Sequence, residues 1–395
     1  MRAAGIICEF NPLHKGHAWM MEEVRRQGVD AIVCVMSGNF VQRGEAAVAD
    51  KLARAEMAVR CGANLVLELP TPWAANTAEI FARGGVEVLQ KTGVVTHLAF
   101  GSECGDADAL QKLAAALDSE EYEENLRALL TGGESFAVCR QRAAAKLVGE
   151  EAALLGRPNN NLGVEYCRAM KRMGAQWNVI TVPRLGAGHD GAPMEGIASA
   201  SHIRKLLLDG QTEEAFAYMP PAAAHVLRRE LAEGRAPASL ANCERAVLYK
   251  LRAMAQEDFA PYDTSGEGLY RRLYQAVRKH STVEEILDAA KTKRYSHARL
   301  RRMVLHAWLG LEEVPNHVPY LRVLAANETG RKLLRQMSDG GAPVLTKAAD
   351  VAALGSAAEA LLRAEAVRTD LYTLAFPALR QSTCGREWRT TPVML

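Results

Sequence analysis

Short apolar runs that alternate with helical patterns constrain the fold of this chain more than any other feature. Each run is brief and continuous, which is typical of strands buried on both faces of a parallel sheet. Strands separated by helices form right-handed βαβ units, so residues 1–205 predict a Rossmann-like, doubly wound parallel sheet in the α/β class. The expected strands are Ala4–Phe10, Ala31–Met36, Leu65–Leu69, Val94–Phe100 and Val179–Val182.

The second half of the chain has a different pattern. After about Ile203 no strand candidates follow, and residues rich in Ala, Leu, Arg and Glu repeat with helical periodicity. We therefore predict an all-helical domain over residues 206–395. A length of 395 residues is ample for two domains with separate cores.

Composition excludes several classes of protein. With 49% hydrophobic residues and a net charge of +2, the chain is not predominantly disordered. No stretch of about 18 uncharged apolar residues is present, so no membrane helix is expected. The first residues lack the pattern of a signal peptide, so we expect a cytoplasmic protein. The eight cysteines are scattered without C-x-x-C spacing, which predicts reduced, structural thiols and no metal site.

Charge is unevenly distributed along the chain. Residues 1–200 hold 20 basic and 24 acidic residues, whereas residues 201–395 hold 28 and 22. The strongest local excess is in residues 268–306, with ten basic and three acidic residues. This excess suggests a polyanionic partner for the second half, although a solvated helix face would give the same pattern.

The most informative motif is the segment Phe10–His17, Phe-Asn-Pro-Leu-His-Lys-Gly-His. It follows the first strand and opens the first helix, where open parallel sheets bind ligands and a helix N-terminus suits a phosphate. His14 and His17 are three residues apart, so both side chains project to one side of the turn. Each can there donate a hydrogen bond to phosphate oxygens. A metal-binding pair, chance histidines in a loop and a helix cap remain alternatives.

A strand followed by H-x-G-H and a helix resembles the nucleotidyltransferase superfamily. Its members activate a substrate with ATP or CTP and release pyrophosphate. A second element of that superfamily, Ser-x-x-x-Ile-Arg, is matched around Ser199, Ser201 and Arg204. The resemblance implies that His14, His17, Ser201 and Arg204 form the catalytic set, in which the arginine supplies charge for the leaving pyrophosphate.

Further segments are similar to the bacterial tRNA(Met) cytidine acetate ligase family. They are Met36–Gly44, Asp50-Lys51, Leu67–Pro70, Phe100–Glu103, Pro158–Gly163 with Glu165-Tyr166, Arg184–Gly188 and Thr292–Tyr295. The resemblance implies a two-step reaction. Acetate and ATP give acetyl-adenylate and pyrophosphate, and the acetyl group then passes to N4 of the wobble cytidine of elongator tRNA(Met).

The same resemblance implies which residues bind ATP. Three ATP-binding positions follow the loop at the start of the chain, namely Gly101, Asn159 and Arg184. Asn160 and Asn161 are alternatives to Asn159. A tyrosine expected before His189 is missing here. Magnesium is possible, but no dedicated ligand set is visible. The residues of the implied ATP loop are Ile7, Cys8, Glu9, Phe10, Asn11, Pro12, Leu13, His14, Lys15, Gly16, His17, Ala18, Trp19 and Met20.

Two further groups are expected to meet the other substrates. A substrate mouth follows the second strand, where Arg43 or Lys51 would hold acetate; an ion pair inside the domain is the alternative. Basic residues with one tyrosine would hold the single-stranded anticodon loop. The mouth group is Ser37, Asn39, Gln42, Arg43 and Lys51, and the RNA group is Lys293, Arg294, Tyr295, Arg299 and Arg302.

The expected partners are thus ATP, acetate and elongator tRNA(Met), with no membrane and no protein partner implied. Two other functions remain open at this stage. One is a metabolite nucleotidyltransferase, which would have no use for the basic helical half. The other is a non-catalytic tRNA-binding protein with a vestigial nucleotide fold.

Overall fold

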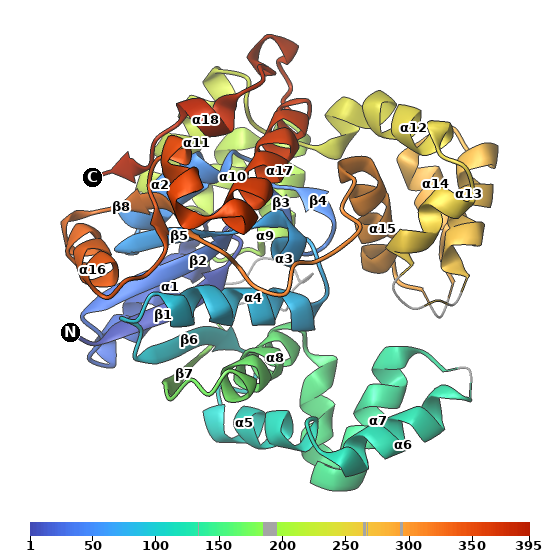
Figure 1. Cartoon of the computed structure of the whole chain (residues 1–395), viewed down its shortest axis with the longest axis horizontal. Coiled ribbons are helices and arrows are strands. Elements are labelled where there is room, and N and C mark those ends of the chain that lie inside the picture. Colours follow the sequence, from blue (N-terminus) through green and yellow to red (C-terminus); the bar gives the residue numbers. More distant parts are fainter. Residues whose placement is uncertain (133, 185–195, 264–265, 267, 293–294) are drawn as a thin grey trace.

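The computed structural model describes all residues except 133, 185–195, 264–265, 267 and 293–294 (Figure 1). Its centre is one large sheet in the order β10-β8-β5-β2-β1-β6-β7. The five expected strands form β1 (Ala3–Cys8), β2 (Ala31–Ser37), β5 (Leu65–Leu69), β6 (His97–Ser102) and β7 (Asn178–Pro183). Neighbours among these five pair in parallel. The predicted doubly wound α/β sheet is confirmed.

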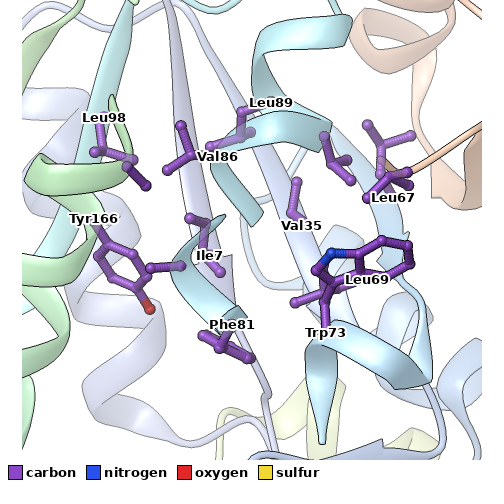
Figure 2. Packing of buried hydrophobic residues seen from close by; sticks show 14 of the residues in the cluster. Ile7, Val35, Leu67, Leu69, Trp73, Phe81, Val86, Leu89, Leu98 and Tyr166 are labelled. Carbon is purple, nitrogen blue, oxygen red and sulfur yellow. The ribbon is translucent and has the colours of Figure 1, made fainter. Parts of the chain in front are cut away.

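Helices cover both faces of this sheet because the strands are apolar on both faces. Ile7, Val35 and Leu67 point to the face covered by α4 (Ala78–Lys91), where they pack with Leu89 and Trp73 (Figure 2). The alternate residues of the same strands pack against α1 (Lys15–Arg26), α2 (Lys51–Arg60) and α9 (Ala200–Leu208). Burial on both faces explains why each strand reads as a continuous apolar run.

The second half returns to the sheet, so the prediction that it is entirely helical is wrong. Strand β8 (Leu321–Ala326) lies antiparallel to β5, and β9 (Val344–Leu345) and β10 (Val393–Met394) pair in parallel with β8. The boundary predicted at residue 205 therefore does not separate the sheet from the helices. A short apolar run such as β8 cannot be distinguished from a buried helical segment by periodicity alone.

Between α9 and β8 the chain does form a helical bundle with its own core, drawn in yellow to orange in Figure 1. Its helices are α12 (Glu244–Ala253), α13 (Leu269–Lys279), α14 (Val283–Ala290) and α15 (His297–Leu309). Helix α15 packs on a small hairpin formed by β3 (Phe40–Val41) and β4 (Glu45–Ala46). A Cβ atom on Gly44 would lie only 2.5 Å from the backbone nitrogen of Arg302. The bundle thus reaches the edge of the sheet where β2 ends.

The remaining helices surround these parts. They are α3 (Thr71–Ala74), α5 (Ala107–Ala116), α6 (Glu120–Leu130), α7 (Phe136–Val148), α8 (Pro158–Arg172), α10 (Thr212–Ala217), α11 (Pro221–Ala232), α16 (Glu328–Asp339), α17 (Ser356–Thr373) and α18 (Arg386–Arg389). In the described part of the chain, no helix has both the length and the apolar character needed to cross a membrane.

Candidate active site

A cleft of about 320 Å³ opens where β1 and β6 end. Its walls come from β1, α1 and the loop between them (residues 6–11, 14, 17 and 20), the hairpin (42 and 43), the start of α4 (78 and 81), β6 (100 and 101), α8 (158, 159, 161, 162 and 166) and the start of α9 (199 and 200). Arg184, after β7, closes one side. Open parallel sheets bind ligands at this position, so the fold itself points to this cleft.

His14 and His17 hold each other and the start of α1 in place. His14 Nδ1 accepts a hydrogen bond from Gly16 N at 3.1 Å, and His17 Nδ1 accepts one from His14 N at 3.3 Å. Their rings stack with centroids 3.7 Å apart. Because each Nδ1 accepts a bond from a backbone N–H, the neutral ring must carry its proton on Nε2. The two rings therefore present two Nε2–H donors side by side.

Both imidazoles are held in the neutral form. Burial lowers the pKa of His14 to about 3, and the positive charge of Arg184 acts in the same direction. Burial, His14 and Arg184 together lower the pKa of His17 well below its usual value. Two neutral N–H donors can stabilise negative charge that develops on phosphate oxygens, and neither imidazole has to release a proton afterwards. The motif is thus a helix cap and a donor pair at the same time.

Asn159 and Arg184 form the opposite wall of the cleft. Arg184 Nη1 donates to Asn159 Oδ1 at 3.0 Å, and Asn159 Nδ2 donates to Glu103 Oε1 at 2.7 Å. A Cβ atom on Gly101 would lie 3.6 Å from Arg184 Cγ. The structure therefore brings these three predicted ATP positions together with the histidines.

The three consecutive asparagines divide between two roles. Asn159 and Asn161 line the cleft, whereas Asn160 is buried beneath it. Asn160 Oδ1 accepts hydrogen bonds from Ser102 Oγ and Glu103 N, both at 2.8 Å, and thereby fixes the turn after β6. Asn160 is consequently a support for this wall and does not line the cleft.

The second predicted phosphate element is only partly in the cleft. Ser199 caps α9, accepting a bond from His202 N at 3.2 Å, and lines the cleft. Ser201 and Arg204 line a neighbouring cavity between α9 and the bundle. Arg204 Nη1 donates to Asn11 O at 2.8 Å, so this side chain supports the backbone of the histidine loop from outside the cleft.

Only part of the expected substrate mouth lines the cleft. Gln42 and Arg43 line the cleft. Lys51 does not, because its ammonium is buried between Glu68 at 2.7 Å and Glu387 at 2.6 Å. The prediction of Lys51 as a mouth residue is wrong, and the alternative, an ion pair inside the domain, is confirmed.

Ser37 and Asn39 are likewise buried beneath the mouth and do not line the cleft. Asn39 Oδ1 accepts a hydrogen bond from Lys51 N at 3.0 Å, which ties the loop after β2 to the start of α2. Tyr166 on α8 also lines the cleft; it belongs to the family-like segment Glu165-Tyr166, to which the sequence assigned no role. Its place in that segment, one helical turn after Leu162, was the available signal.

The predicted RNA residues lie at the start of α15. The guanidinium of Arg299 sits 5.0 Å from the ring centroid of Tyr295 and 3.3 Å from Asp263 Oδ1. Arg302 Nη1 donates to Gln42 O at 3.4 Å, and burial, with a contribution from Arg299, lowers the pKa of Arg302 to about 10. The side chain of Arg302 thus connects the bundle to the cleft wall. Residues 293 and 294 and the segment containing His189 lie outside the described residues.

Comparisons with known proteins agree with this geometry. A model of the HIGH Nucleotidyl Transferase family matches residues 1–387. The tRNA(Met) cytidine acetate ligase of Syntrophomonas wolfei is 35% identical, over 100% of this chain and 99% of that protein. The enzyme of the same name from Caldanaerobacter subterraneus is 36% identical, over 95% and 96% of the two chains.

Solved structures give the same result. The crystal structure of apo TmcAL from Thermotoga maritima superposes with a TM-score of 0.96 at 32% identity, covering 100% of both chains. The structure of that protein bound with alpha-thio ATP has a TM-score of 0.93 at 31% identity, again over the full length of both. The chain therefore belongs to the HIGH nucleotidyl transferases and, within them, to the tRNA(Met) cytidine acetate ligase family.

Proposed function

We propose that this chain activates acetate with ATP and acetylates N4 of the wobble cytidine of elongator tRNA(Met). The pair of neutral imidazole donors at the start of α1 carries this proposal, because it lies in a cleft of a chain similar over its full length to ligases of that name. The cytoplasm, where tRNA is modified, is the compartment that this partner implies.

The first step follows from the groups in the cleft. An acetate oxygen attacks the α-phosphorus of ATP, the bond to the β-phosphate oxygen breaks, and pyrophosphate leaves with the electron pair. Negative charge builds up on the oxygens of the α-phosphate during this attack. The Nε2–H groups of His14 and His17 are proposed to donate to these oxygens, and Arg184 offsets the charge of the triphosphate.

The second step needs the tRNA beside the same cleft. The bundle supports this placement, because α15 packs on the hairpin that carries Gln42 and Arg43. The stacked pair Tyr295 and Arg299 lies near the start of that helix. An aromatic ring and a guanidinium suit an unpaired base and its phosphate, so we propose that this end of α15 contacts the anticodon loop.

Mass analysis of nucleosides tests the whole proposal. Unmodified elongator tRNA(Met) is incubated with the protein, ATP and isotopically labelled acetate, then digested. The proposal predicts N4-acetylcytidine that carries the label and needs ATP. Exchange of pyrophosphate into ATP that requires a phosphorylated metabolite instead of acetate would favour the metabolite nucleotidyltransferase. Binding of tRNA without any ATP turnover would favour a non-catalytic protein.

A further inference from the structure

Acetyl transfer to cytidine requires that a proton be removed from the nucleophile, which the first step does not require. The exocyclic N4 is a weak nucleophile because its lone pair is delocalised into the ring. When N4 attacks the acetyl carbon it becomes positively charged and must lose a proton. A side chain that accepts this proton in the transition state accelerates such reactions by about 10²–10⁴-fold.

Most polar groups of the cleft cannot accept that proton. Each Nδ1 of His14 and His17 already accepts a backbone N–H, which leaves only an N–H donor on the other side of each ring. Burial raises the pKa of the Cys8 thiol and of the Tyr166 hydroxyl, so both stay protonated at neutral pH. Arginines and amides are donors or weak acceptors. Among the described residues that line the cleft, Glu9 is the one carboxylate.

The structure holds Glu9 at the point where β1 ends. Oε1 accepts a hydrogen bond from Gln42 N at 2.8 Å, and Arg54 Nη1 donates to the Glu9 carbonyl at 2.6 Å. Within the described part of the chain, no donor contacts Oε2, and the half-buried side chain lines the cleft. One carboxylate oxygen is thus anchored to the hairpin while the other is available to the cleft.

The surroundings also make Glu9 a better base than an exposed glutamate. Burial is the main cause that raises its pKa, and Glu45 on the hairpin acts in the same direction. The hydrogen bond from Gln42 and the charges of Arg204 and Arg54 oppose this rise without cancelling it. A higher pKa means a greater affinity for a proton, which favours proton transfer from an amine under attack.

We propose that Glu9 is the general base of the acetyl-transfer step. This inference rests on the proposed function. The N4 lone pair forms the bond to the acetyl carbon, the bond from that carbon to the AMP phosphate oxygen breaks, and AMP leaves with the electron pair. The proton of N4 passes to Glu9 Oε2 and then to solvent, so no other reactant is needed.

The variant Glu9→Gln tests this role. Glutamine retains an oxygen that can accept the bond from Gln42 N but cannot take up a proton. Two rates are compared: acetate-dependent exchange of pyrophosphate into ATP, and single-turnover transfer from preformed acetyl-adenylate to tRNA. Transfer is expected to fall about 10²–10⁴-fold. This loss should exceed the loss of exchange at least tenfold, and the acidic limb of the pH profile of transfer should disappear.

Two further variants serve as controls. Glu9→Asp keeps a carboxylate on a shorter arm and should recover part of the transfer rate and the acidic limb, even if Glu9→Gln is poorly folded. Glu45→Gln removes a neighbouring carboxylate outside the cleft, which pairs with Arg301 at 2.9 Å, and should change transfer less than tenfold.

The outcomes separate this inference from the proposed function. Equal losses in exchange and transfer would overturn the assignment, because Glu9 would then position ATP or the hairpin. A transfer rate in Glu9→Gln within tenfold of the unaltered protein would also overturn it. If the unaltered protein shows neither acetate-dependent exchange nor acetylcytidine, the proposed function itself fails.

Discussion

Replacing His17 by asparagine separates the two roles that the structure gives to this side chain. Asparagine can place its Oδ1 near the position of Nδ1, where it can still accept the bond from His14 N. It has no atom near the position of Nε2. The variant His17→Asn therefore keeps the helix cap and loses the donor, whereas His17→Ala loses both.

The expected magnitudes follow from these contacts. Loss of one donor to an oxyanion costs about 10²–10³ in rate, so both variants should slow acetate-dependent pyrophosphate exchange by that factor. The ring of His17 also meets Phe10 edge-on at 5.0 Å, a contact worth about 1 kcal/mol. A lost cap adds about 1 kcal/mol. His17→Ala should therefore be destabilised by about 2 kcal/mol and His17→Asn by about 1 kcal/mol.

Exchange kinetics and urea denaturation of the three proteins check both halves of this prediction. The two variants should lose similar amounts of exchange while differing in stability, if the Nε2–H group and the cap are separate contributions. It is refuted if His17→Asn exchanges within tenfold of the unaltered protein, because the Nε2–H group would then have no part in the first step. The matched variant Arg25→Ala, on the far end of the same helix, should leave exchange intact.

The remaining predictions concern stability. Lys51→Met should cost about 3–5 kcal/mol in urea denaturation, because the buried Glu68 carboxylate loses its cation and Glu387 keeps only Arg322; a cost under about 1 kcal/mol would contradict the ion-pair account. Gly163→Ala should cost about 1–3 kcal/mol, since the new Cβ would lie 2.4 Å from Phe100 Cε2, and an unchanged denaturation midpoint would count against it. Burial lowers the pKa of His14 to about 3 and of His306 to about 4. Below about pH 6.5 these two histidines are therefore protonated in the unfolded chain and still neutral in the folded chain. Stability should fall between pH 6.5 and 4, less steeply in His306→Gln; equal slopes for the two proteins would argue against this linkage.

Strands and motifs whose sequence signal lies within a few neighbouring residues were predicted correctly. The expected strands were located correctly because each is buried on both faces and is flanked by helical patterns. His14 and His17 were singled out because they lie three residues apart at a strand–helix junction, and the resemblance to the H-x-G-H proteins supplied their expected role. The serine element was located at the start of a helix, and of its two serines the structure makes Ser199 the cap of α9.

Features that depend on distant partners were missed or misread. The buried ammonium of Lys51 is neutralised by Glu387, near the opposite end of the chain, and the same carboxylate lies 3.3 Å from Arg322 Nε in β8. Arg322 interrupts the apolar run of β8, and only its partner Glu387 explains how this arginine can be buried there. Likewise, Arg204 has the residue type of a phosphate ligand, but its donor is directed to the Asn11 carbonyl by the packing of α9.

A crystal structure of the protein grown with ATP, in the absence of acetate, tests the central claim most directly. Phosphate oxygens should lie within hydrogen-bonding distance of Nε2 of both His14 and His17, with Arg184 beside the triphosphate. A nucleotide bound in the neighbouring cavity at Arg204, with the histidine cleft unfilled, would contradict it.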